Sequence, residues 1–481
     1  MAQKMLKFVD VPRGMPEKRA ADARRDDFGE IYREFAAAKA EEQASRCSQC
    51  GVPYCQQHCP LHNNIPDWLK LVAEDRLEEA YQVSQATNTF PEICGRICPQ
   101  DRLCEGNCVI EQSGHGTVTI GAVEKYITDT AWEKGWVKPG KPIKERPESV
   151  GVIGAGPGGL AAADALRRRG FQVTVYDRYD RSGGLMIYGI PGFKLEKHVV
   201  TRRNGQLEAA GVKFVLNCTV GKDRTFEEIR SAHDAVLIAT GVYKSRDLGG
   251  PGAGLPGIKK ALDYLTASNR HGFGDNVPEY TSGELNAQGK NVVVIGGGDT
   301  AMDCVRTAIR QGAKSVKCLY RRDRANMPGS QREVANAEEE GVEFVWLAAP
   351  KGFVANETDD HVAGVRVAKM RLGAPDVTGR QTPEEIEGAD YTEPADLVIK
   401  ALGFDPEELP TLWGCEDLPV TRWGTVRTDH RTHMTALEGV YAVGDIVRGA
   451  SLVVWAIRDG REAADAIAAK FDDAARVMAA E

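Results

Sequence analysis

The chain has 481 residues, 42% of them hydrophobic and 27% charged, and its formal net charge is −8. This length accommodates two to four domains, each large enough to bury a core. The mixed, mildly acidic charge gives no electrostatic case for binding nucleic acid or an anionic membrane. No run of about 18 apolar residues predicts a membrane-spanning helix. The first residues lack the apolar segment of a secretory signal, so a cytoplasmic location is expected.

The first expected element is a charged helix over residues 16–35, PEKRAADARRDDFGEIYREF. Together with the cysteine-rich segment that follows, this helix is a candidate surface for docking a partner. A solvated surface helix is the alternative, because charged runs are common on exposed helix faces.

Eight of the twelve cysteines lie in one short segment, in two groups of four. The quartets are Cys47, Cys50, Cys55 and Cys59, and then Cys94, Cys98, Cys104 and Cys108. Zinc ribbons usually separate two C-x2-C pairs by a spacer. Here each quartet is continuous, as in ferredoxin-type [4Fe–4S] sites, where the last cysteine of a run can bind the other cluster. Zinc knuckles and metal-free thiols remain alternatives, although clustered free thiols in the cytoplasm are prone to oxidation.

A linker rich in proline, glycine and charge is expected over residues 133–149, and a dinucleotide-binding fingerprint follows it. In SVGVIGAGPGGLAAADALRRRGFQVTVYDR, an apolar strand precedes Gly154, Gly156 and Gly159. These glycines allow a tight turn, close approach of a pyrophosphate, and close helix–strand packing. Asp177 ends the second strand and is placed to accept hydrogen bonds from a ribose.

A second fingerprint, KNVVVIGGGDTAMDCVRTAIRQGAKSVKCLYRRDR, has Gly296, Gly298 and Ala301 in the corresponding positions. Its second strand ends in Arg321 and Arg322 rather than in an acid. Arginine in this place suits the 2′-phosphate of NADPH, whereas a solvated basic turn is the alternative. Two such units in one chain predict FAD on one and NADPH on the other.

Three further strands end in small residues that let the backbone pass close to a cofactor. HDAVLIATG ends in Thr240 and Gly241, and ADLVIKALG ends in Gly403. GVYAVGD ends in Gly444 and Asp445, ahead of a helical pattern, and Asp445 is a candidate flavin ligand.

These motifs resemble the two-dinucleotide-domain flavoprotein reductases. CSQCGVPYCQQHCP, NTFPEICGRICPQDRLCEGNC, GGLMIYGIPGFKLEK and LYRRDRANMP resemble, in the same order, the small (β) subunits of bacterial NADPH-dependent glutamate synthases. The resemblance covers nearly the whole chain. It implies an α/β fold in which two Rossmann-like, glutathione-reductase-like domains follow a helical iron–sulfur domain. The implied domains are 1–145 for two [4Fe–4S] clusters, 146–285 with 426–481 for FAD, and 286–425 for NADPH.

The resemblance also implies site residues. One cluster would be held by Cys47, Cys50, Cys55 and Cys108, and the other by Cys59, Cys94, Cys98 and Cys104. Gly184 and Leu185 would join the FAD site, and Asp299 and Thr300 the NADPH site. The family passes electrons from NADPH to a large α subunit that makes L-glutamate from L-glutamine and 2-oxoglutarate.

The expected chemistry belongs to the cofactors, so no general acid or base is assigned. The other cysteines, Cys218, Cys304, Cys318 and Cys415, form no C-x2-C or C-x4-C pair, so a disulfide-reductase exit is not predicted. Two alternatives are a free-standing NADPH:ferredoxin-type or sulfur-directed reductase, and a redox-sensing or scaffolding protein without turnover.

Overall fold

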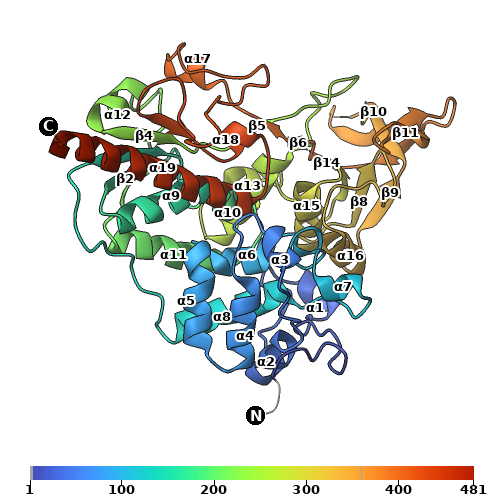
Figure 1. Cartoon of the computed structure of the whole chain (residues 1–481). Coiled ribbons are helices and arrows are strands. Elements are labelled where there is room, and N and C mark those ends of the chain that lie inside the picture. Colours follow the sequence, from blue (N-terminus) through green and yellow to red (C-terminus); the bar gives the residue numbers. More distant parts are fainter. Residues whose placement is uncertain (1–3, 359, 481) are drawn as a thin grey trace.

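The computed structural model describes residues 4–358 and 360–480, and the chain has three structural parts. Figure 1 shows the cysteine-rich helices (blue) beneath two sheets with flanking helices, and the C-terminal helix (red) running from the middle of the molecule to the left. The two large sheets are five-stranded and parallel, which confirms the expected α/β class. No helix in the described residues is long and apolar enough to cross a membrane.

The cysteine-rich part is a bundle of short helices around one apolar core. Its elements are α2 (Ala37–Ala44), α3 (Tyr54–Gln57), α4 (Ile65–Ala73), α5 (Leu77–Thr87), α6 (Pro91–Ile97), η1 (Gln100–Arg102), α7 (Val109–Gln112) and α8 (Ile120–Glu133). Proline in the first turn of α4 and of α6 helps to set where these helices begin, because it costs no helical hydrogen bond there. Trp68, Leu69 and Val72 of α4 are buried in the same core as Ile127 of α8.

The first sheet has the strand order β16-β4-β1-β2-β3. Its unit contains β1 (Ser149–Ile153), α9 (Pro157–Arg168), β2 (Gln172–Tyr176), α10 (Leu185–Tyr188), α11 (Lys197–Ala209), β3 (Lys213–Val215), α12 (Phe226–Ala232), β4 (Ala235–Ile238), β16 (Val440–Ala442), α18 (Asp445–Arg448) and α19 (Val453–Ala480). Helix α19 crosses α9 so closely that a Cβ on Gly460 would lie 2.1 Å from the carbonyl oxygen of Gly158. This crossing holds the start of α19 near the first glycine loop.

The second sheet has the order β6-β14-β7-β8-β9. Its unit contains β6 (Ile258–Lys260), α13 (Ala261–Gly272), α14 (Pro278–Thr281), β7 (Asn291–Ile295), α15 (Asp299–Arg310), β8 (Ser315–Tyr320), α16 (Gln331–Glu339), β9 (Glu343–Trp346) and β14 (Leu397–Lys400). A smaller antiparallel sheet is inserted between β9 and β14, and consists of β10 (Ala348–Ala355), β11 (Val362–Pro375), β12 (Gln381–Glu385) and β13 (Tyr391–Pro394).

The chain passes from one unit to the other at positions that differ from the expected boundaries at 285 and 425. Strand β6, expected in the first unit, pairs with β14 of the second sheet. Trp413 of α17 (Leu409–Trp413), expected in the second unit, stacks on Phe226 of the first unit with ring centroids 5.0 Å apart. The chain crosses in a ribbon of β5 (Lys244–Ser245) and β15 (Phe404–Asp405). Strand pairing over long sequence distances sets both crossings, and we propose them as the unit boundaries.

The helix expected over residues 16–35 is wrong for most of that stretch, where only α1 (Ala21–Arg25) is α-helical. Lys18 and Arg24 form ion pairs with Glu339 of α16 at 2.7 and 2.6 Å. These contacts hold the stretch against the second unit and override its local helical preference. Two of the cations in the stretch are thus paired within the chain, and the docking role expected for it stays a prediction.

The cysteine-rich part is locked to the first unit by a buried ion pair. Arg203 of α11 donates two hydrogen bonds to the carboxylate of Glu92 of α6, at 2.6 and 2.9 Å. Both side chains are buried, and breaking such a pair typically costs about 3–5 kcal/mol. Phe90 and Cys94 also belong to the same apolar core as the first sheet. A rigid connection of this kind keeps the cysteine loops at a fixed distance from the first glycine loop.

Candidate functional site

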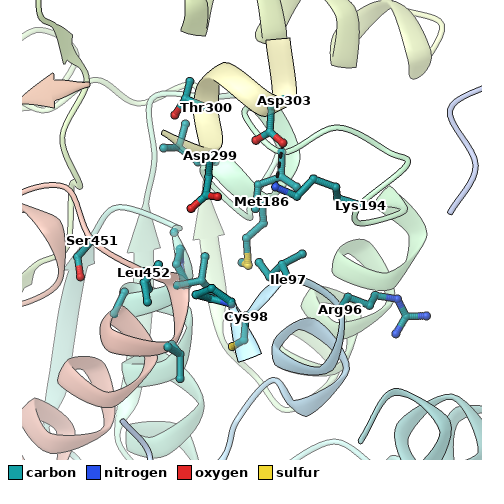
Figure 2. A pocket seen from close by; sticks show the side chains of 18 of the residues that line it. Arg96, Ile97, Cys98, Met186, Lys194, Asp299, Thr300, Asp303, Ser451 and Leu452 are labelled. Carbon is teal, nitrogen blue, oxygen red and sulfur yellow. Dashed lines mark hydrogen bonds and ion pairs between the residues drawn. The ribbon is translucent and has the colours of Figure 1, made fainter. Parts of the chain in front are cut away.

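A cavity of about 300 Å³ lies where the three parts meet. Its lining includes the first glycine loop, the start of α15 and the loop that carries Cys98. Figure 2 shows this cavity, with labelled side chains that include Cys98, Met186, Lys194, Asp299 and Asp303. Both nucleotide-type units and one cysteine of the second quartet therefore face the same space.

The first glycine loop is shaped by close backbone approaches. Gly154 has a φ of +111°, and a Cβ there would lie 2.3 Å from the carbonyl oxygen of Ala239. A Cβ on Gly159 would lie 2.0 Å from the carbonyl oxygen of Gly154. A Cβ on Gly156, in contrast, would meet no atom within 4 Å. The loop is packed against protein at two glycines and open at the third, as a pyrophosphate at a helix N-terminus requires.

Asp177 follows β2 and holds the same loop. Its carboxylate accepts the backbone N–H of Ala155 at 2.6 Å and that of Tyr179 at 2.8 Å. Burial raises the pKa of Asp177 above its usual value, although both backbone donors act in the opposite direction. The carboxylate ties the glycine loop to the end of β2, and its remaining lone pairs are available to a ribose hydroxyl.

The other candidate flavin residues lie at the same place. The cavity is lined by Leu185, Thr240, Gly241, Gly444 and Asp445, and a Cβ on Gly184 would lie 2.8 Å from the Cα of Gly156. The hydroxyl of Thr240 is buried and has no hydrogen-bond partner among the described residues. Burial raises the pKa of Asp445 to about 6. An unpaired hydroxyl and a desolvated carboxylate beside an open glycine loop fit a dinucleotide such as FAD.

The second glycine loop repeats this geometry at the start of α15. Gly296 has a φ of +148°, and a Cβ there would lie 2.2 Å from the carbonyl oxygen of Ala401. A Cβ on Gly298 would meet no atom within 4 Å, and Ala301 is fully buried. The loop therefore has the same open position for a pyrophosphate that the first loop has.

Two further candidate nucleotide residues, Asp299 and Thr300, begin α15 and line the cavity. The carboxylate of Asp299 accepts the backbone N–H of Ser330 at 3.0 Å and contacts Arg102 of the cysteine-rich part at 3.4 Å. Asp299 thus orders the loop ahead of α16 as well as lining the cavity. The cysteine-rich part reaches the nucleotide position through this contact.

Arg321 and Arg322 follow β8, where the sequence places a 2′-phosphate contact. Arg321 is exposed and Arg322 is half-buried, with its guanidinium 6.0 Å from the ring of Tyr320. Neither arginine forms an ion pair with a carboxylate in the part of the chain that the structure describes, whereas nearby Arg324 pairs with Glu338 at 2.8 Å. Two uncompensated guanidinium groups at this strand end fit a phosphate.

The structure brings Cys47, Cys50, Cys55 and Cys108 around one small cavity. Burial raises the pKa of Cys55 to about 12, with further increases from Cys47 and Cys108. Two N–H groups of Gln49 donate to the sulfur of Cys47, at 3.4 and 3.3 Å. This grouping crosses the two quartets and agrees with the ligand set that the family resemblance implies.

The second set consists of Cys59, Cys94, Cys98 and Cys104. A hydrogen bond with Cys94, together with burial, raises the pKa of Cys98, and burial and Cys59 raise that of Cys104. The charge of Cys55 also raises the pKa of Cys104, so the two sets are neighbours. No group of three potential ligands in the described residues is close enough to hold one metal ion. A [4Fe–4S] cluster needs four thiolates that bind separate irons, and each set has that number of thiols.

Sequence reasoning missed a buried ion pair in the cavity wall. Lys194 donates to the carboxylate of Asp303 at 2.9 Å (Figure 2). Burial raises the pKa of Asp303 to about 6, although Lys194 lowers it. Asp303 lies one helical turn after Asp299, so two acids on one face of a nucleotide-type helix were the available signal. The pair joins the first unit to α15 beside the cavity.

The fold and the cavity define an oxidoreductase that combines a cysteine-rich domain with two dinucleotide-type units. Residues 148–460 match the family of pyridine nucleotide-disulphide oxidoreductases. Residues 24–136 match the family described as dihydropyrimidine dehydrogenase domain II, 4Fe-4S cluster. The structure of FprA from Mycobacterium tuberculosis in complex with NADPH shares this fold, with a TM-score of 0.58 and 20% identity over 69% of this chain and 86% of that chain.

Two relatives extend the comparison to full length. The glutamate synthase [NADPH] small chain of Azospirillum brasilense is 68% identical over 97% of this chain and 96% of that protein. A longer Escherichia coli protein, whose name specifies only an oxidoreductase, is 47% identical over 95% of this chain and 69% of its own length. The chain belongs to the family of glutamate synthase [NADPH] small chains, as its motifs predict.

Proposed function

We propose that this chain is the NADPH-oxidising subunit of glutamate synthase. In this role it carries electrons from NADPH through FAD and two [4Fe–4S] clusters to a large α subunit, which makes L-glutamate from L-glutamine and 2-oxoglutarate. The observation that carries the proposal is the shared cavity, because it is lined by both nucleotide motifs and by Cys98.

The proposed residue roles follow the geometry. FAD would be held by Gly154, Gly156, Gly159, Asp177, Gly184, Leu185, Thr240, Gly241, Gly444 and Asp445, and NADPH by Gly296, Gly298, Asp299, Thr300, Ala301, Arg321 and Arg322. When bound, the two cofactors would supply hydride transfer from NADPH to the flavin and the onward release of single electrons. The chain's own residues bind and orient them and exclude water from the cavity.

The electron path would run outward through the cysteine-rich part. The second set comes first, because Cys98 lines the cavity. The first set adjoins it, since Cys55 influences the pKa of Cys104. Val52 and Tyr54, which lie between Cys50 and Cys55 in the sequence, have exposed side chains, so this edge of the first set lies near the surface. We therefore propose that the large subunit docks on the cysteine-rich part.

A free-standing reductase is the second candidate function. The observation that favours it is the 47% identity to a longer protein named only as an oxidoreductase. Both candidates need the same cofactors, so the acceptor distinguishes them. We favour glutamate synthase because the 68% identical small chain matches this chain end to end. A cytoplasmic location suits either candidate, because reducing conditions keep thiols free.

The cofactor content tests the proposal. Anaerobically purified chain is expected to contain iron, labile sulfide and FAD, with up to about eight irons, because four thiolates bind one [4Fe–4S] cluster. The measurement is a quantitative assay for iron, zinc, sulfide and flavin on the same sample. Stoichiometric zinc without labile sulfide would contradict the cluster assignment.

A further inference from the structure

The second unit contacts the cysteine-rich part at a loop that carries a proposed cluster ligand. Arg332 of α16 donates to the side-chain oxygen of Gln100 at 2.7 Å and approaches the carbonyl oxygen of Cys98 at 3.5 Å. Gln100 donates in turn to the carbonyl oxygens of Cys94 and Gly95, each at 3.2 Å. One arginine of the nucleotide-type unit is thus linked to the backbone of two cysteines in the second set.

The loop around Gln100 is held firmly in place. Gln100 is buried, and a Cβ on Gly121 of α8 would lie 2.4 Å from its side-chain nitrogen. Two residues further on, Arg102 donates to the carbonyl oxygen of Pro328 in the second unit at 2.7 Å. These contacts hold the loop and the arginine in a defined arrangement.

The charge of Arg332 faces the cavity that Cys98 also lines. Its Nε is buried and has no hydrogen-bond partner in the described part of the chain. Against the effect of burial, the charge of Arg332 acts to lower the pKa values of Glu105 and Glu333. Each of these carboxylates, however, forms an ion pair with another arginine: Glu105 with Arg13 at 3.0 Å and Glu333 with Arg306 at 2.6 Å. The guanidinium of Arg332 is therefore available to act on a negatively charged group at Cys98.

We propose that Arg332 is a positioning residue for the cluster of the second set and that its charge raises the reduction potential of this cluster. This inference rests on the proposed function, which places a cluster there. Reduction makes a thiolate-bound cluster more negative, so a nearby cation stabilises the reduced form. One unit charge in a partly buried site shifts a one-electron equilibrium roughly tenfold, which is about 59 mV. The unit that binds the nucleotide thus sets how readily the cluster accepts an electron.

The test is a redox titration of the holoprotein, followed by electron paramagnetic resonance, after iron and flavin have been measured. Arg332→Gln is expected to lower the potential of one cluster by an amount equivalent to a roughly tenfold shift. Arg332→Lys keeps the charge and is expected to keep the wild-type potential. The matched control is Arg324→Gln, because Arg324 lies in the same unit and pairs with Glu338 at 2.8 Å.

An unchanged potential in Arg332→Gln would overturn the inference, and so would an equal shift in Arg332→Lys. If Arg332→Gln loses iron, its potential cannot be measured, and the Arg332→Lys variant then tests the role of the charge. Wild-type iron content and potential in the lysine variant support the role of the charge, and iron loss in that variant overturns it. A wild-type chain without any cluster would overturn the proposed function itself, which is a distinguishable result.

Discussion

Replacing Arg321 and Arg322 together by glutamine is expected to lower kcat/KM for NADPH more than 100-fold and to change that for NADH little. Each charged hydrogen bond to the 2′-phosphate contributes about 1.5–3 kcal/mol, and NADH lacks this phosphate. Neither arginine has a carboxylate partner within the described residues, so their loss leaves no buried charge unpaired. The measurement is steady-state reduction of ferricyanide with each nucleotide.

The same ferricyanide assay also provides the control and the result that would contradict this prediction. Arg324→Gln is the control, since Arg324 pairs with Glu338 and is expected to leave the preference for NADPH unchanged. An equal loss for NADPH and NADH in the double variant would mean that Arg321 and Arg322 support the fold rather than the phosphate.

Replacing Cys98 by alanine is expected to abolish electron delivery to the large subunit while NADPH-dependent ferricyanide reduction persists. Cys98 belongs to the proposed ligand set that faces the cavity, and a [4Fe–4S] cluster needs four thiolates. The flavin and nucleotide residues are untouched by this change. The measurements are iron content, which falls by about half when one of two clusters is lost, and glutamate formation with added large subunit.

Cys415 provides the matched control, because it is a half-buried thiol outside the cysteine-rich part. Cys415→Ser is expected to keep iron content and glutamate formation at the wild-type level. Wild-type glutamate formation by the Cys98→Ala variant would mean that electrons leave the flavin by a path that does not include this cluster.

Several parts of the site could be predicted from the sequence, because residues close together in the chain determine them. Gly154 and Gly296 have positive φ and lie where a Cβ would collide with backbone, so only glycine fits. Asp177 follows a buried strand as expected, and the structure adds that its carboxylate accepts the backbone N–H of Ala155 in the glycine loop. Each of these features depends on residues within one strand–turn–helix unit, and such units carry their own signal.

The remaining parts depend on contacts between distant segments. Lys194 reaches Asp303, and Arg332 reaches Gln100, only after the three parts have packed together. The stretch around Lys18 lost its expected helix because Glu339, more than 300 residues away, holds it against the second unit. Local propensity carries no information about such partners, so these features could be found only in the folded chain.

The most direct test of the central claim is glutamate formation after this chain is mixed with a separately purified large subunit of glutamate synthase. With NADPH, L-glutamine and 2-oxoglutarate, the mixture is expected to form L-glutamate, whereas this chain alone reduces ferricyanide but forms none. The result follows if the cavity and the two cysteine sets deliver electrons to a second protein. Glutamate formed by this chain alone, or no glutamate from the mixture while ferricyanide reduction persists, would contradict the account.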